Sequence, residues 1–255
     1  MNARLSPSTS ASQQGIALIV VMVMLLLATI VVLSSTRLSW LNERMVGSES
    51  DHQRAFAAAE ALIRDAERDI KGVQADATTP CQADPAFIGC RNFGAGAPFF
   101  PQDVADLDLL QARLKANAIG SCLRGICLPD STTTLDREQW TTKLAAMTAG
   151  TGDTAVPARY GEFTGIDPAS SGNALLQWSR PGVTPAVAAR AWYWVEVFLY
   201  TEAAGMTAKS GHALTPDMHS HPFVYRITAY VQGMKPGTRV WLRSIYVPRP
   251  QADLD

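Results

Sequence analysis

The sequence predicts an α+β protein in which one long N-terminal helix packs on a C-terminal antiparallel β-sheet, with loop-rich, disulfide-bearing insertions between them. Three observations support this prediction. Residues 15–33 form a 19-residue segment without a charge. Apolar residues then recur at steps of three and four as far as residue 70, apart from one polar gap around 48–52, and three aromatic and β-branched segments follow residue 190.

The apolar segment 15–33 has the length of a membrane-spanning helix. At about 1.5 Å per residue it extends roughly 28 Å, close to the thickness of the hydrocarbon layer. A cleaved secretory signal has an apolar core of about 7–15 residues and a small-residue cleavage site. Here the apolar run is longer, no A-x-A follows it, and the helical pattern continues. We therefore expect a retained transmembrane helix over 16–36 and an amphipathic half over 37–72, which Gly72 ends.

The apolar face of the amphipathic half has two expected uses. Its distal part, which includes Phe56 and Leu62, is expected to pack on the sheet, because an isolated amphipathic helix leaves such side chains in water. Trp40, closer to the apolar segment, fits either an anchor in the lipid headgroups or a contact with a neighbouring subunit.

Residues 73–190 form a loop-rich region with short helices. Gly, Pro and Asp are frequent, and helical spacing recurs over 102–118 and 136–149. Short strands are expected near 159–163 and 175–179. Beyond this region, 191–255 reads as a sheet of three strands, at 192–200, 223–231 and 240–247, with a hairpin turn at 233–237. The connection 201–222 is long and polar, which favours a functional or subunit-contacting loop.

Four cysteines predict disulfide bonds in an oxidising compartment. Three pairings are possible. Short loops close most easily, which favours Cys81 with Cys90 and Cys122 with Cys127, while a crossed pairing stays open. The gaps of eight and four residues within these pairs fit zinc knuckles poorly.

Composition and motifs argue against several function classes. A net charge of −1 disfavours a general nucleic-acid binder, which needs excess Lys and Arg. No nucleophile elbow, phosphate loop or His-Glu-x-x-His motif is present, so we expect neither an enzyme nor a cofactor. His219 and His221, with His212 and Asp217 nearby, are the one metal-like group; Pro222 follows them, and a solvated loop is the favoured interpretation, so no metal is expected.

Several segments together carry a family resemblance. They are QQGIALIV at 13–20 before the apolar helix, NERMVG at 42–47, AFAAAE at 55–60 and, more loosely, FVYRITA at 223–229 with SIY at 244–246. In these segments the chain resembles PilX-type minor pilins of type IV pili. The resemblance implies a type IV pilin-like fold, with 16–36 as the transmembrane and filament-core helix. It also implies a leader, 1–15, that prepilin peptidase removes between Gly15 and Ile16, and N-methylation of Ile16. The alternative is a short cytoplasmic tail on an ordinary signal anchor.

Position 20 departs from the pilin pattern. Most pilins carry Glu five residues into the mature chain, where this chain has Val20. A carboxylate inside a bilayer costs about 2.5–3.5 kcal/mol unless it has a partner. In pilins, as the resemblance implies, that partner is the charged N-terminus of the preceding subunit. A subunit without the carboxylate fits best where no subunit precedes it, which favours a priming or tip role over a repeating shaft position; neutral drift is the alternative.

The expected function is therefore a minor pilin that helps prime pilus assembly, sits at or near the tip and supports adhesion and twitching motility. The implied partners are other minor pilins, the major pilin, prepilin peptidase, a tip adhesin and inner-membrane assembly proteins. The expected location is the inner membrane, with a single span and a periplasmic C-terminal domain, and later the extracellular pilus. The alternatives are a type II secretion minor pseudopilin, which shares the missing Glu, and a membrane-anchored periplasmic binding protein.

Overall fold

The structure is a computed structural model that describes residues 14–81, 90–91, 99–116, 122–129, 137–150, 152–179, 184, 186–200 and 222–248. These residues divide into two units, one up to Ser50 and one from Asp51 onward. The expected leader up to residue 13, the metal-like histidines, nearly all of the 201–222 loop and residues 249–255 lie outside the described residues.

Helix α1, Gln14–Lys71, contains both the apolar segment and the amphipathic segment in one 58-residue element. It ends in a Schellman motif, in which the Gly72 N–H donates to the Asp69 carbonyl and the Val73 N–H donates to the Arg68 carbonyl. Gly72 has a φ of 66°, a conformation that costs other residues energy because their Cβ meets the backbone. The sequence-based prediction of one long helix ending at Gly72 is confirmed.

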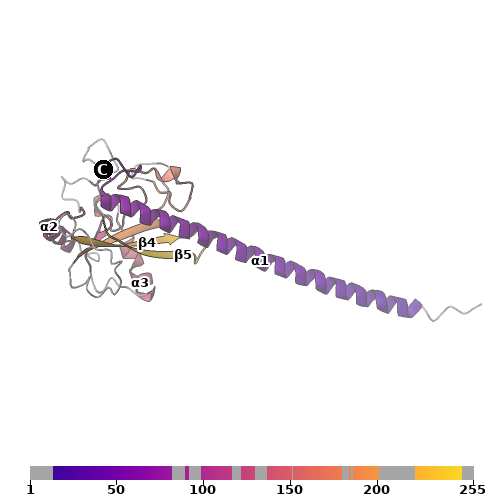
Figure 1. Cartoon of the computed structure of the whole chain (residues 1–255). Coiled ribbons are helices and arrows are strands. Elements are labelled where there is room, and N and C mark those ends of the chain that lie inside the picture. The colour runs from indigo at the N-terminus through magenta and orange to yellow at the C-terminus, as the bar shows by residue number, and fades with distance from the viewer. Residues whose placement is uncertain are drawn as a thin grey trace, which may run out of the picture. The chain divides into compact units, whose positions relative to one another are not determined.

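A five-stranded sheet follows, with the strand order β1-β2-β3-β4-β5. Its three long strands are β3 at Ala191–Leu199, β4 at Phe223–Gln232 and β5 at Arg239–Tyr246, and they pair antiparallel in chain order. The predicted strands and hairpin therefore lie where expected, to within one residue at each end. Figure 1 shows β4 and β5 alongside the C-terminal part of α1.

The sheet is mixed rather than purely antiparallel. Two short strands, β1 at Cys122–Leu123 and β2 at Ile126–Cys127, form a hairpin, and β2 pairs with β3 in the parallel direction. Sequence patterning missed these strands because each has only two residues, too few to show alternation. The hairpin extends the sheet past β3, so the cysteine turn becomes part of the domain core.

The short helices form within the predicted ranges, but the short strands do not. Helix α2 covers Val104–Lys115, where the Asp103 side chain caps it by accepting from the Asp106 N–H, and α3 covers Arg137–Met147. The 3₁₀ turns η1 and η2 cover Gly152–Thr154 and Pro168–Ser171. Segments 159–163 and 175–179 are turns and coil; the first is only preceded by a single bridge from Ala158 to Tyr193. Phe163 and Leu175 lie in the hydrophobic core, and the backbone N–H groups of Gly161 and Leu175 donate to the side chains of Asp65 and Asn173.

The main core lies between one face of the sheet and the last five turns of α1. Small side chains, including Ala55, Ala58 and Ala66, let the helix approach the sheet closely, where Tyr193, on β3, is fully buried. Leu62 and Ile63 complete the buried stripe of the helix. Phe56 was expected to join it but is 43% exposed, because at about 100° per residue it lies at the edge of the buried stripe, whose middle Ala55 and Ala59 occupy.

A second, smaller core covers the opposite face of the sheet. Trp192 and Trp194 alternate with the residues that face α1, and they pack with Tyr230 and with Met147 of α3. The Trp192 and Tyr230 rings stack with centroids 5.9 Å apart. The Cys122 and Cys127 side chains belong to this cluster, so the hairpin closes one end of it.

Candidate functional site

The first half of α1 presents apolar side chains to its surroundings. Every described side chain from Ile16 to Leu33 is exposed, and the helix is long and apolar enough to cross a membrane. The structure places Gly15 and Ile16 in the first turn of α1 and Val20, 47% exposed, one turn further on. Such a surface is stable only in lipid or against other apolar helices.

Four hydroxyl side chains near the end of this segment are satisfied within the helix itself. Thr29 and Thr36 donate to carbonyls three residues earlier, and Ser34 and Ser35 donate to carbonyls four residues earlier, at 2.8–2.9 Å. Because these hydroxyls already have acceptors, the helix can pass through hydrocarbon beyond Leu33. The next charged residue is Arg37.

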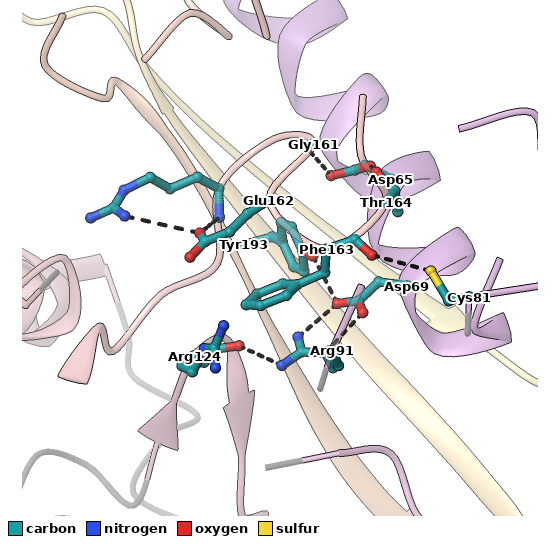
Figure 2. A network of polar contacts seen from close by, with 11 residues as sticks. Asp65, Asp69, Cys81, Arg91, Arg124, Gly161, Glu162, Phe163, Thr164 and Tyr193 are labelled. Carbon is teal, nitrogen blue, oxygen red and sulfur yellow. Dashed lines mark hydrogen bonds and ion pairs between the residues drawn. The ribbon is translucent and has the colours of Figure 1, made fainter. Parts of the chain in front are cut away.

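A buried ion pair joins the end of α1 to the loop that follows it (Figure 2). The Arg91 guanidinium donates to both carboxylate oxygens of Asp69 at 2.8 and 2.6 Å, and the Tyr193 hydroxyl donates to the same carboxylate at 2.9 Å. Burial acts against the charge of Arg91, but the Asp69 carboxylate outweighs it and raises the pKa of Arg91. Burial also raises the pKa of Tyr193, so its hydroxyl keeps the proton that it donates.

The two disulfides flank this ion pair. Cys81 and Cys90 are bonded, with Cα atoms 5.5 Å apart, and Arg91 follows directly. Cys122 and Cys127 are bonded across the β1–β2 hairpin, with Cα atoms 4.1 Å apart. These are the local pairs that loop length favours. Arg91 connects the two, because its third nitrogen donates to the Arg124 carbonyl at the hairpin tip at 3.0 Å.

The hairpin tip is held by backbone contacts on both sides. Arg124 and Gly125 have φ angles of 48° and 79°, the arrangement of a type I′ turn. The Gly125 N–H donates to Val156 and its carbonyl accepts from the Val195 N–H. A Cβ on Gly125 would lie 2.4 Å from the Cβ of Ala158, so the close approach requires glycine.

A second carboxylate, Asp65, lies one helical turn before Asp69, and no ion pair among the described residues includes it. It accepts from the Gly161 N–H at 2.8 Å and from the Thr164 hydroxyl at 2.5 Å. Burial raises the pKa of the Asp65 carboxyl to about 7, and the neighbouring Asp69 charge adds to the effect. Asp65 therefore fixes the 161–164 loop on the helix and changes its charge near neutral pH.

A cavity of about 520 Å³ lies beside the end of α1. Phe100, Tyr225 and Tyr246 contribute to its lining. Asp69 and Arg91 also line it, but they satisfy each other, so neither offers a free charge to a ligand. Within the residues that the structure describes, no group of three His, Cys, Asp or Glu residues lies close enough to hold a metal ion.

The residues predicted from sequence do not come together in one site. Gly15, Ile16 and Val20 lie in the first unit, whereas the four cysteines lie in the second. The polar network of Asp65, Asp69 and Arg91 was not predicted. Its signal was present: two aspartates four residues apart lie on the helix stripe that also carries Leu62 and Ala66, and a charge on an apolar stripe needs a buried partner.

Two models of known protein families match this chain, and one of them covers the exposed apolar helix. A family model described as "PilX N-terminal" matches residues 14–64, and one described as "Type IV pilus assembly protein PilX C-term" matches residues 123–248. The chain belongs to the PilX family of type IV pilus assembly proteins. No curated protein and no solved structure matches it.

PilX membership agrees with the elements described above. The N-terminal match covers the apolar half of α1 and much of the part that packs on the sheet, and the C-terminal match begins inside the β1–β2 hairpin and ends after β5. This PilX-family chain is thus a minor pilin of type IV pilus assembly, a structural component with an N-terminal helix that fits membrane anchoring. The region between the two matches contains the Cys81–Cys90 disulfide and Arg91.

Proposed function

We propose that this PilX-family chain primes pilus assembly and sits at or near the pilus tip, as a structural subunit rather than an enzyme, supporting adhesion and twitching motility. The observation that carries the proposal is Val20. It occupies the apolar, exposed first part of α1 at the position where a pilin carboxylate would neutralise the N-terminus of the preceding subunit. A subunit that cannot provide this charge is best suited to a position with no predecessor.

In this proposal, prepilin peptidase cleaves between Gly15 and Ile16 and the new N-terminus at Ile16 is methylated. The apolar helix holds the subunit in the inner membrane, with the disulfide-bonded domain in the periplasm, and later packs against other subunits in the fibre. The two disulfides support an oxidising compartment for that domain. The major pilin, other minor pilins, a tip adhesin and inner-membrane assembly proteins are the proposed partners.

Cleavage provides the first test. Co-expression with a prepilin peptidase should shorten the chain by 15 residues. Gly15→Val should block the shortening, because it places a branched side chain next to the peptide bond that is cut. An unchanged length for the wild-type chain contradicts the proposal and favours a membrane-anchored binding protein.

A type II secretion pseudopilin is the second candidate, since such proteins share the missing Glu. Deleting the gene distinguishes the two. Loss of surface pili with normal enzyme secretion supports the pilus role, whereas loss of secreted enzymes with intact piliation supports the pseudopilin role.

A further inference from the structure

Three residues just beyond the apolar segment of α1 share one face of the helix. Arg37, Trp40 and Arg44 follow spacings of three and four, and at about 100° per residue they lie within about 60° of each other around the axis. All three are exposed, and 54% of the Trp40 surface is accessible. We call these three residues the membrane-flank cluster.

The cluster is preorganised by a contact between two of its members. The Arg44 guanidinium carbon lies 4.1 Å from the centroid of the Trp40 ring, a cation–π geometry. Helical side chains tilt toward the N-terminus, so this contact brings the Arg44 charge about one turn closer to the apolar segment and to Arg37. The two cations and the indole therefore form a single surface on one side of α1, next to the end of the apolar segment.

The hydrogen-bonded hydroxyls at 34–36 set where the membrane-flank cluster lies relative to the bilayer. Because Ser34, Ser35 and Thr36 donate to helix carbonyls, the segment compatible with hydrocarbon runs over 16–36, roughly 31 Å of helix. Arg37 then begins at the boundary of the hydrocarbon layer. Trp40, one turn further, falls in the headgroup region, where aromatic residues that are apolar at one end and polar at the other are enriched.

The cluster carries positive charge without a protein partner. Within the described residues, no ion pair involves Arg37 or Arg44. The acidic residue nearest to Arg44 in sequence, Glu43, lies about 100° away around the helix. In the proposed orientation these arginines are on the translocated side, opposite to the usual bias of basic residues toward the cytoplasmic side. Anionic lipid headgroups at that position would supply both arginines with a counter-charge.

We propose that the membrane-flank cluster is a binding site for the headgroup of an anionic phospholipid, with Arg37 and Arg44 contacting the phosphate and Trp40 seated among the headgroups. The proposal deepens the membrane-anchored state in the proposed function and rests on it. Each basic residue near an anionic surface contributes about a fivefold preference, so the pair should favour an anionic over a zwitterionic lipid by about 25-fold. The preference should weaken as salt is raised.

The fluorescence of Trp40 can report the lipid preference, since the other five tryptophans belong to the second unit. The full chain is reconstituted in phosphatidylcholine bilayers that contain brominated phosphatidylglycerol or, at the same fraction, brominated phosphatidylcholine. Quenching at Trp40 is the difference between the wild-type chain and Trp40→Phe, and the ratio of the two quenching constants gives the lipid preference. The test variant is Arg37→Gln with Arg44→Gln; Arg64→Gln, an exposed arginine of the same helix, is the matched control.

We expect the brominated phosphatidylglycerol to quench preferentially in the wild-type chain and in Arg64→Gln, and the ratio to fall to about one in the double variant. Equal quenching by both lipids in the wild-type chain overturns the proposal while leaving the membrane anchor intact. Absence of quenching by either lipid contradicts the anchor itself. If the double variant keeps the lipid preference but enters pili less often, the arginines serve a contact between subunits and the proposal is wrong.

Discussion

Arg91 donates two hydrogen bonds to Asp69, at 2.8 and 2.6 Å, from a loop position 22 residues away, and both side chains are buried. Arg91 also lies against the faces of Phe100 and Phe163, with its guanidinium carbon 5.0 and 3.8 Å from the ring centroids. The end of α1, the disulfide loop and β3 therefore converge on one charged pair.

Replacing Arg91 by Met should destabilise the globular unit by about 3–5 kcal/mol, because Asp69 is left buried without its counter-charge. Arg91→Met combined with Asp69→Leu should recover much of the loss, since no unpaired charge remains. Chemical denaturation of the full chain in detergent, followed by tryptophan fluorescence, measures both free energies of unfolding. Equal destabilisation by the single and double changes would mean that packing around Arg91, rather than the ion pair, supports the fold.

Asp65 should make stability fall as pH rises from about 4 to about 7. Its pKa is about 7 in the folded protein and about 3.9 in an unfolded chain, so the folded state holds a proton that the unfolded state has lost. The stabilising effect of that proton is complete below about pH 4 and lost by about pH 7. The free energy of unfolding of the wild-type chain minus that of Asp65→Asn should drop by roughly 2–3 kcal/mol between pH 5 and pH 8.

Several neighbouring groups set the pKa of Asp65. Asp69 raises its pKa, Arg68 lowers it, and Thr164 and Gly161 donate to it. Because Asp65→Asn preserves shape, titrations elsewhere cancel in the difference between the two proteins. A difference that is flat with pH would show that Asp65 is already ionised in the folded state.

Gly125→Ala should destabilise the domain by roughly 2–5 kcal/mol, from the strain of a positive φ and the clash with Ala158. Gly72→Ala is the matched control. Its φ is also positive, but a Cβ there meets no atom within 4 Å, so only the backbone strain of about 1–2 kcal/mol applies. Thermal unfolding of both variants tests this, and similar losses would show that the β1–β2 hairpin adjusts without cost.

Val20→Glu should let the subunit enter the pilus shaft, because the restored carboxylate can neutralise the N-terminus of a preceding subunit. Val20→Gln, polar and of the same size as Glu but uncharged, controls for shape. Immunogold labelling of fibres measures position. Labels confined to fibre ends for the wild-type chain and for Val20→Glu alike would remove the support that Val20 gives to a tip role.

Much of the fold could be predicted from patterns that extend over many residues. An uncharged segment and a long apolar period predict helix α1. Aromatic and β-branched segments of eight to ten residues predict strands β3, β4 and β5. The Gly72 stop is a local signal with one dominant physical cause, the left-handed conformation at a helix end.

What escaped prediction depends on contacts between distant residues. The parallel pairing of β2 with β3 joins Ile126 to Val195, and nothing within two-residue strands specifies that partner. The Asp69–Arg91 pair joins the helix to a loop in the same way. Phe56 looked like a core residue by spacing alone, but the small alanines beside it set which face of the helix approaches the sheet.

The most direct test of the account is mass spectrometry of pili sheared from cells. We predict that the preparation contains this chain beginning at an N-methylated Ile16, with residues 1–15 absent, and that deleting the gene reduces the number of pili. Sheared pili that lack the chain, together with an unchanged pilus number in the deletion strain, would contradict the account.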